Sequence, residues 1–315
     1  MRRLLAVLVL AGASVNAQTV TQVFGSGAYS FSMEFVTIGN PNNVADTGQY
    51  SNQGSGEPYT AGSVSYVYNL GKYEISRDMV LKASTSGGFG LTLADMTSYG
   101  GNGGNRPATG ISWNEAARFV NWLNTSKGYQ SAYNFDGSGN FQLWGAGQYS
   151  GSNKYRHKNA YYFLPSRDEW YKGAYGSPSG NWYNYPEGSD GPPGGVSGGT
   201  SGAVWGRTSP ADIDSAGGLS PYGTMAQGGN VWEWTETAFD GSNDSAIEQL
   251  EVRGGAWNSD DPVFGSYQLS ASYRASGQDM SEDYLGFRVA SIPEPSSLSL
   301  LVAGGAVLIM AKWIR

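Results

Sequence analysis

The sequence predicts an α+β fold with little regular secondary structure. Two Ser-x-x-Glu capping boxes, at Ser112 and Ser166, each precede an amphipathic segment and indicate a helix. Short runs of alternating apolar and aromatic residues indicate strands. Glycine-rich stretches separate these runs, and the chain of 315 residues contains 47 Gly. The expected domain therefore has few, short elements joined by long loops.

The first half of the chain supplies strands and then helices. The pattern of 31–38 predicts a strand, and the alternation at 64–68 predicts a second one. Ser76 is suited to cap a short helix that runs through Leu81. After Ser112, apolar residues at helical spacing predict a helix of about three turns.

The second half contains one more helix and then mostly loops. After the capping box at Ser166, Trp170 and Ala174 are expected to face the core. The many glycines of 188–202 predict an irregular loop. Short aromatic segments after it predict strands, at 231–234, 252–257 and 285–290.

Composition excludes several classes of function. The chain has no Cys and one His, so thiolate metal sites, disulfides and multi-histidine metal sites are excluded. With 19 Lys+Arg against 26 Asp+Glu, the net charge is −7, and the isoelectric point is near 4.8. An acidic chain without a basic tract is repelled by phosphate backbones, so we expect no nucleic-acid partner.

The first 17 residues resemble a secretory signal peptide. Arg2 and Arg3 precede a short apolar run, and small residues lead to a predicted cleavage after Ala17. The apolar run is too short to span a bilayer. The sequence therefore predicts an exported protein.

The other end, 291–315, carries a second targeting pattern. Pro293-Glu294-Pro295 is followed by an apolar stretch that we expect to form a transmembrane helix over 298–314, with cations at its end. This arrangement resembles the PEP-CTERM sorting signal of bacteria that produce exopolysaccharide. The resemblance implies processing by an exosortase-type protease as a partner. It also implies a location in the cell envelope, at the cell surface or in the extracellular matrix of a Gram-negative-type bacterium.

Between these ends, 18–290 is expected to form one domain that resembles the formylglycine-generating enzyme (sulfatase-modifying factor) family. Two of its motifs, Gly-Asn-Val-Trp-Glu-Trp at 229–234 and Arg-Gly-Gly-Ala-Trp at 253–257, are the most specific. Four more follow the family order, at 71–76, 110–124, 163–170 and 286–290. The resemblance implies the formylglycine-generating-enzyme-like, C-type-lectin-related α+β fold.

The family's oxidase chemistry is not expected here. Family enzymes hold copper with two cysteines, and the corresponding positions fall near Ser266 and Ala271. A hydroxyl and a methyl group cannot hold Cu(I) as thiolates do. Related sulfoxide synthases need three histidines for iron, whereas this chain has one. We therefore expect no copper and no residue with the family's catalytic role.

Calcium is a candidate cofactor implied by the same resemblance. The family binds a structural Ca²⁺ through a Glu and backbone carbonyls, which correspond here to Glu233 and to the carbonyls of Gly229 and Val231. The upstream Asn or Asp of the family is Ala226 in this chain. The alternative is that Glu233 forms only local hydrogen bonds while the flanking tryptophans pack in the core.

Two further groups are weaker candidates for chemistry. Asp212 and Asp214 have a spacing that suits a carboxylate pair or a metal site, although a turn is the simpler interpretation. His157, within a polar, basic stretch, is expected to be a solvated loop residue rather than a catalytic base.

The segment 257–285 is the candidate ligand-binding surface. In the related fold it lies on the side that faces ligands. Tyrosines with Asn, Gln and Asp offer flat apolar faces and short hydrogen-bonding groups, which suit sugars or protein surfaces. An ordinary solvated loop is the alternative. The candidate binding residues are Asn258, Tyr267, Gln268, Tyr273, Asp279 and Tyr284.

These observations predict a secreted or surface-attached domain that binds envelope or matrix polysaccharide, or an envelope protein, without catalysis. An enzyme of altered chemistry on the same fold is the alternative, with Asp212 and Asp214 as candidate groups. A formylglycine-generating oxidase is disfavoured by the missing cysteines, and a purely structural matrix component is a further class.

Overall fold

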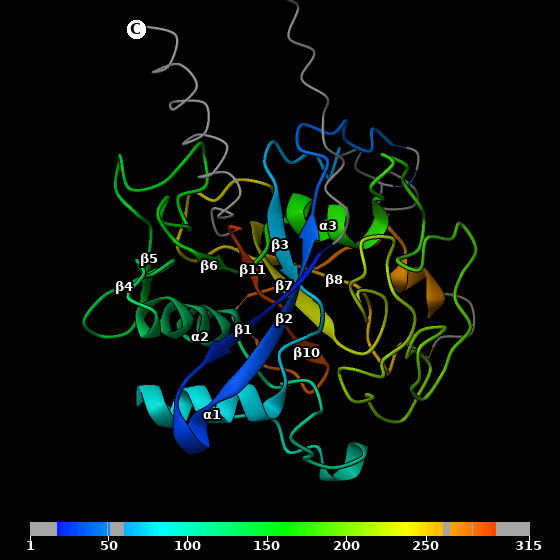
Figure 1. The fold of residues 1–315 in the computed structure, drawn as a ribbon, viewed down its shortest axis with the longest axis horizontal. Helices are drawn as coiled ribbons and strands as arrows, with labels where there is room; N and C mark the ends of the chain where they lie inside the picture. The colour runs from blue at the N-terminus through cyan, green and yellow to red at the C-terminus, as the bar shows by residue number, and fades with distance from the viewer. Residues whose placement is uncertain (1–17, 49, 51–59, 261–264, 279, 294–315) are drawn as a thin grey trace, which may run out of the picture.

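The computed structural model describes residues 18–48, 50, 60–260, 265–278 and 280–293. Two small sheets lie near the centre, helices α1 and α2 lie on one side, and long loops fill the opposite side (Figure 1). The predicted signal peptide and the predicted transmembrane helix lie outside the described residues. Among the residues that are described, no helix is long and apolar enough to span a membrane.

The first sheet has five strands in the order β1-β2-β3-β11-β6, all paired antiparallel. It begins with a hairpin of β1 and β2, joined by a tight connection at Gly25, where φ is +68° and a Cβ would lie 2.2 Å from the Tyr29 carbonyl oxygen. The strands are β1 (Thr19–Phe24), β2 (Phe31–Ile38), β3 (Tyr68–Gly71), β6 (Tyr162–Phe163) and β11 (Ala290–Ser291).

The second sheet has four strands in the order β10-β7-β8-β9. Only the pairing of β10 with β7 is parallel, and the other two are antiparallel. Its strands are β7 (Trp232–Ala238), β8 (Leu250–Arg253), β9 (Ala275–Gly277) and β10 (Leu285–Gly286), and a separate hairpin pairs β4 (Asn134–Phe135) with β5 (Phe141–Gln142).

Both predicted capping boxes are confirmed. Ser112 and Ser166 each accept a hydrogen bond from the backbone N–H of the Glu three residues later, and each Glu bonds back to the cap N–H. Ser76 caps the first helix by accepting from Met79 N–H. The helices are α1 (Arg77–Gly87), α2 (Trp113–Ser126) and α3 (Arg167–Tyr175), with 3-10 turns at η1 (Gly27–Tyr29), η2 (Thr97–Tyr99) and η3 (Ser266–Leu269).

Three sequence predictions need correction. Helix α1 continues to Gly87, well beyond Leu81, because the left-handed residue Gly88 ends it. In the predicted strand 64–68 only Tyr68 is strand, as the first residue of β3. The predicted strand 285–290 is divided between β10 in the second sheet and β11 in the first, so one short segment links the two sheets.

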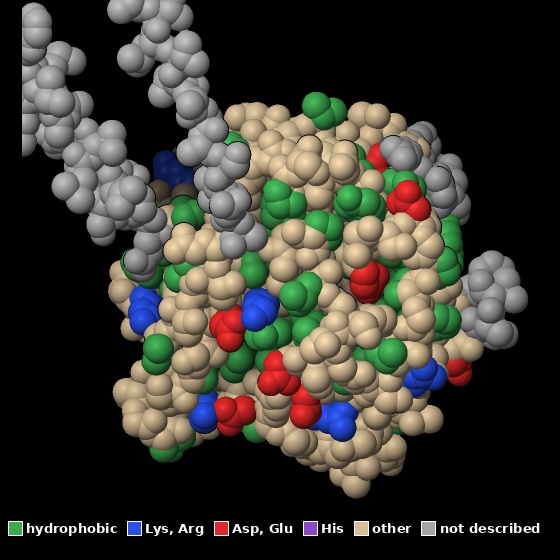
Figure 2. Space-filling model, turned by 45° about the vertical axis from the view of Figure 1, so that its right-hand side comes forward, with side chains coloured by type: hydrophobic (Ala, Val, Ile, Leu, Met, Phe, Trp, Pro, Cys, Tyr) green, Lys and Arg blue, Asp and Glu red, His purple; other side chains and the backbone are tan. Residues whose placement is uncertain are grey.

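The core is rich in aromatic side chains, and the surface carries few charges. Trp113, Trp170 and Trp234 are among the largest fully buried side chains. Figure 2 shows small, separate groups of charged side chains on a mostly uncharged face. This agrees with a charged fraction of 14%, well below the roughly 25% typical of soluble domains.

Candidate ligand-binding pocket

A pocket of about 390 Å³ opens over the second sheet, on the segment that the sequence marks as a ligand surface. All four strands of the sheet contribute to it, together with the loop after β8, η3 and the loop before β10. The lining residues are Trp232, Val252, Asn258, Ser259, Asp260, Gln268, Ala275, Ser276, Met280, Tyr284 and Leu285.

One side of the pocket is aromatic. Trp232 begins β7, and its backbone N–H donates to the backbone carbonyl of Tyr284 at 2.9 Å. This hydrogen bond holds the two residues at the same end of the sheet. The Trp232 ring lies 5.7 Å from Tyr273, and Tyr273 lies 5.4 Å from Tyr267 in an edge-to-face contact. These contacts make a row of three aromatic rings, of which Trp232 lines the pocket.

The other side is polar. The Ser259 hydroxyl donates to the Gln268 side-chain oxygen at 2.6 Å and accepts from Ala256 N–H, so it ties the loop after β8 to η3. Asn258 is half-buried and Asp260 is exposed at the rim. Within the described part of the chain, neither of these two side chains has a hydrogen-bond or ion-pair partner, so both polar groups are available to a ligand.

The structure brings most of the predicted binding residues together. Asn258, Gln268 and Tyr284 line the pocket. Tyr267 and Tyr273 continue the aromatic row from Trp232, and Asp279 lies outside the described residues.

Sequence reasoning missed Trp232 as a pocket residue, because the motif suggested a core position for it. Trp234 is indeed fully buried, whereas Trp232 keeps 8% of its surface exposed and lines the pocket. The two side chains share one face of β7, since residues two apart in a strand point the same way. The position of Trp232 at the start of the strand is the only sequence signal that could have separated them.

The two positions that correspond to the family's cysteines, Ser266 and Ala271, lie two and three residues from the pocket residue Gln268 in the sequence. Ser266 opens η3 and is half-buried. Ala271 is fully buried in a cluster with Trp170 and Tyr171, and its carbonyl accepts from Arg253. With no cysteine anywhere in the chain, neither position provides a thiolate.

The candidate calcium ligand Glu233 is engaged by protein groups. Its side chain points away from the two tryptophans and is fully buried. One oxygen lies 2.6 Å from Arg288 Nη2, and the other accepts from Arg288 Nε and from Trp170 Nε1, both at 2.6 Å. A cation would have to displace this arginine. Calcium binding by Gly229, Val231 and Glu233 stays a prediction.

Glu74 lies beside this ion pair. Burial raises its pKa well above the usual range, and repulsion from Glu233 adds to the effect. Its carboxyl group accepts from the Asn230 side chain at 2.5 Å and from Val231 N–H at 3.2 Å. The Gly-Asn-Val-Trp-Glu motif is therefore fixed by buried polar contacts that join β7 to the segment after β3.

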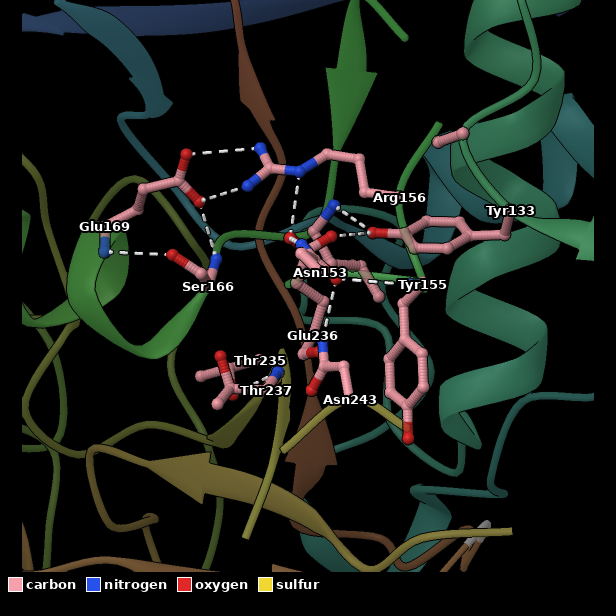
Figure 3. Close-up of polar contacts among 12 residues, drawn as sticks. Tyr133, Asn153, Tyr155, Arg156, Ser166, Glu169, Thr235, Glu236, Thr237 and Asn243 are labelled. Atoms are coloured by element: carbon pink, nitrogen blue, oxygen red, sulfur yellow. Dashed lines mark hydrogen bonds and ion pairs between the residues drawn. The ribbon is translucent and has the colours of Figure 1, made fainter. Parts of the chain in front are cut away.

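A second buried polar cluster surrounds Arg156 (Figure 3). Its guanidinium forms two hydrogen bonds with Glu169, at 3.1 and 3.3 Å, and its Nε lies 2.9 Å from Glu236. Glu236 also accepts from Tyr133 at 2.8 Å and from Asn153 at 2.5 Å. Burial raises the pKa of Glu236 to about 7, although Arg156 opposes that shift. All of these carboxylate contacts are internal, which gives the cluster a structural role.

Arg156 and Asn153 also line a second pocket, of about 470 Å³, beside this cluster. His157 lies there too, and the expectation that it is solvated was wrong. The residue is 9% exposed, and its ring packs edge-on against Trp144 at 4.7 Å and accepts from Asn159 N–H. Burial lowers its pKa.

The aspartate pair of the enzyme hypothesis lies in a turn, as the simpler interpretation predicted. Asp212 is ion-paired with Arg106 at 3.3 Å, and Asp214 accepts from the Asn105 side chain at 2.8 Å. Both carboxylates reach the same neighbouring segment, so they tie two loops together. Neither lines the pocket over the second sheet.

Among the described residues, a five-stranded antiparallel sheet, a four-stranded mixed sheet, three short helices, long glycine-rich loops and a pocket over the mixed sheet define a fold of the formylglycine-generating-enzyme type. The chain belongs to the sulfatase-modifying factor enzyme 1-like domain family, which matches residues 31–292. The absence of cysteine agrees with the expectation that this member lacks the family's catalytic pair. No curated protein sequence matches the chain.

Solved structures share this fold at low sequence identity. Variable protein 1 of Treponema denticola is 18% identical with a TM-score of 0.55, and the match covers 87% of this chain and 99% of that one. CarF is 17% identical with a TM-score of 0.55, covering 82% and 98%. PvdO of Pseudomonas aeruginosa is 17% identical with a TM-score of 0.52, covering 86% and 98%. At these identities the likeness extends to the fold alone.

Proposed function

We propose that this chain is an exported, non-catalytic binding module that holds polysaccharide of the cell envelope or extracellular matrix in the pocket over the second sheet. The observation that carries the proposal is the lining of that pocket. Trp232 and the half-buried Tyr284 line it together with the amide of Asn258 and the carboxylate of Asp260, and these two polar groups have no partner among the described residues. Aromatic faces cover the apolar faces of sugar rings, and short polar groups bond their hydroxyls.

The ends of the chain supply the proposed location. The signal peptide at 1–17 would direct export, and the PEP-CTERM pattern at 291–315 would present the chain to an exosortase-type protease. Until that step the apolar stretch would hold the domain at the membrane. The domain would then work in the envelope, at the surface or in the matrix of a Gram-negative-type bacterium.

A binding role is supported over the alternative enzyme by where the carboxylates lie. Among the described lining residues of the pocket, Asp260 is the only carboxylate, whereas a general acid and base would need two groups. The buried carboxylates of Glu169, Glu233 and Glu236 are bonded to arginines. An envelope protein as ligand remains the second candidate, because an aromatic and polar pocket suits either partner.

Retention of the purified protein on the extracellular polysaccharide of its own producing cells tests the proposal. Tyr284→Ala should weaken retention at least about fivefold, as loss of a central aromatic contact does. Tyr29→Ala, which removes an exposed tyrosine of η1 in the connection between β1 and β2, is the matched control and should bind like the unchanged protein. If the folded wild-type protein is not retained, the polysaccharide proposal fails, and envelope proteins become the ligands to test.

A further inference from the structure

The charge of the pocket rim indicates which kind of polysaccharide it accepts. The described lining residues include Asp260 and no Lys, Arg or His. Glu282 and Asp283 directly precede Tyr284 in the chain. Glu282 is exposed, and Asp283 is half-buried. Burial raises the pKa of Tyr284, and these two carboxylates raise it further. The negative charges of Glu282 and Asp283 therefore act on Tyr284, which lines the pocket.

The one cation that the segment 258–285 supplies is engaged elsewhere. Arg274 is the one Lys, Arg or His in the sequence 258–285. Its Nη1 donates to the Phe239 carbonyl at 2.7 Å and lies 3.4 Å from a Glu251 carboxylate oxygen, and its guanidinium stacks on the Phe239 ring at 4.2 Å. Arg274 is therefore held at the β8 side of the sheet and does not line the pocket.

The two aromatic residues of the lining add a second attraction for a positive group. Trp232, which keeps 8% of its surface exposed, and the half-buried Tyr284 line the same pocket whose rim carries Asp260. The face of an aromatic ring attracts a cation, most strongly for tryptophan, and a nearby carboxylate reinforces it. Aromatic faces with a carboxylate and no competing cation form a site for an ammonium group, and they repel a carboxylate or sulfate.

We infer that the pocket selects an amine-bearing polysaccharide, that is, a polymer with free hexosamine units, over neutral and acidic polysaccharides. This inference rests on the proposed function, because it names the ligand class of the same site. The ammonium group would lie between Asp260 and the aromatic row, while Asn258 bonds ring hydroxyls.

The test compares three oligosaccharides of equal length on the full chain by isothermal titration calorimetry at low salt and about pH 6. They are a glucosamine hexamer, an N-acetylglucosamine hexamer and a galacturonate hexamer. We expect the glucosamine hexamer to bind at least about fivefold more tightly than the acetylated one, and the galacturonate hexamer to bind most weakly. Added salt should reduce the difference, since the rim charges are exposed to solvent.

Two charge-neutralising variants locate the effect. Asp260→Asn should reduce glucosamine hexamer affinity about fivefold and leave N-acetylglucosamine hexamer affinity unchanged. Asp244→Asn removes an equal charge from an exposed residue of the β7–β8 loop and should change neither affinity. Both side chains are exposed, so each variant is expected to fold, and equal thermal midpoints verify this.

Each other outcome overturns the inference in a distinguishable way. Equal binding of the two glucosamine forms, or tighter binding of galacturonate, refutes amine selection but leaves a polysaccharide site. If a hexalysine peptide binds as tightly as the glucosamine hexamer, the pocket recognises positive charge alone. That outcome refutes the inference that the ligand is a polysaccharide. If no hexamer binds, amine selection fails, and retention on the native polysaccharide decides the proposed function separately.

Discussion

The stability of this domain should fall as the pH rises from about 5 to 8, and the Arg156 cluster is one cause. Burial raises the pKa of Glu236 from 4.5 to about 7 in the folded protein. A folded state that holds its proton more tightly than the unfolded chain is favoured below the unfolded pKa and loses that advantage as the pH passes the folded pKa. The shift corresponds to about 3 kcal/mol of unfolding free energy.

The variant Glu236→Gln keeps the shape of the side chain and removes its charge. Its amide oxygen can take the place of Oε1 and accept from Arg156 and Asn153, while the amide nitrogen takes the place of Oε2, which accepts from Tyr133 in the unchanged protein. We expect the loss of unfolding free energy between pH 5 and 8 to shrink by about 2–3 kcal/mol relative to the unchanged protein. Urea unfolding at several pH values, followed by tryptophan fluorescence, measures this difference.

A matched control separates Glu236 from the other carboxyl group that titrates in the same range. Burial also raises the pKa of Glu187 to about 7, and one of its oxygens has no hydrogen-bond partner among the described residues. Glu187→Gln should remove a separate part of the slope, and the two effects should add because Glu236 lies in β7 and Glu187 in the loop after α3, with no shared partner among the described contacts. An unchanged slope in Glu236→Gln would refute the argument that burial dominates over Arg156.

Four further perturbations test the buried groups and the helix caps. Arg288→Met leaves the Glu233 carboxylate without its cation and should cost about 3–5 kcal/mol in urea unfolding, whereas the double variant with Glu233→Leu should recover most of that loss. Ser112→Ala removes the cap of α2 and should cost about 1 kcal/mol by the same measurement. Burial lowers the pKa of Lys172 to about 8, so Lys172→Met should raise the urea midpoint more at pH 6, where the buried amine is charged, than at pH 9. Because Arg288 occupies the Glu233 carboxylate, EDTA should leave the thermal midpoint of the purified protein unchanged, and a large EDTA-induced drop would favour the calcium site.

Local sequence patterns predicted the elements that depend on near neighbours. The capping boxes at Ser112 and Ser166 need only residues three apart, and both formed as predicted. The strand 31–38 followed from its own alternation. Very short strands such as β6 and β9 escaped prediction, because two or three residues carry no periodicity and pairing partners far along the chain create them.

The candidate site was predicted in part for the same reason. Tyrosines with Asn and Gln in 257–285 marked a binding surface by composition, and Asn258, Gln268 and Tyr284 do line one pocket. That Trp232 joins them could not be foreseen, because its N–H bonds to the Tyr284 carbonyl only after β7 and β10 pair in parallel.

The sequence by itself determined the family, the absence of thiolate chemistry and the positions of the helix caps, because these depend on residue identity and short spacing. Only the tertiary structure decided which charges are neutralised and which face a ligand. Glu233 meets Arg288 across 55 residues, and Arg156 meets Glu236 across the fold, so both carboxylates are satisfied internally. Asp260 has no such partner among the described residues and stays at the rim of the pocket. Long-range packing makes this distinction, since burial and pairing of a charge depend on groups that the local sequence does not specify.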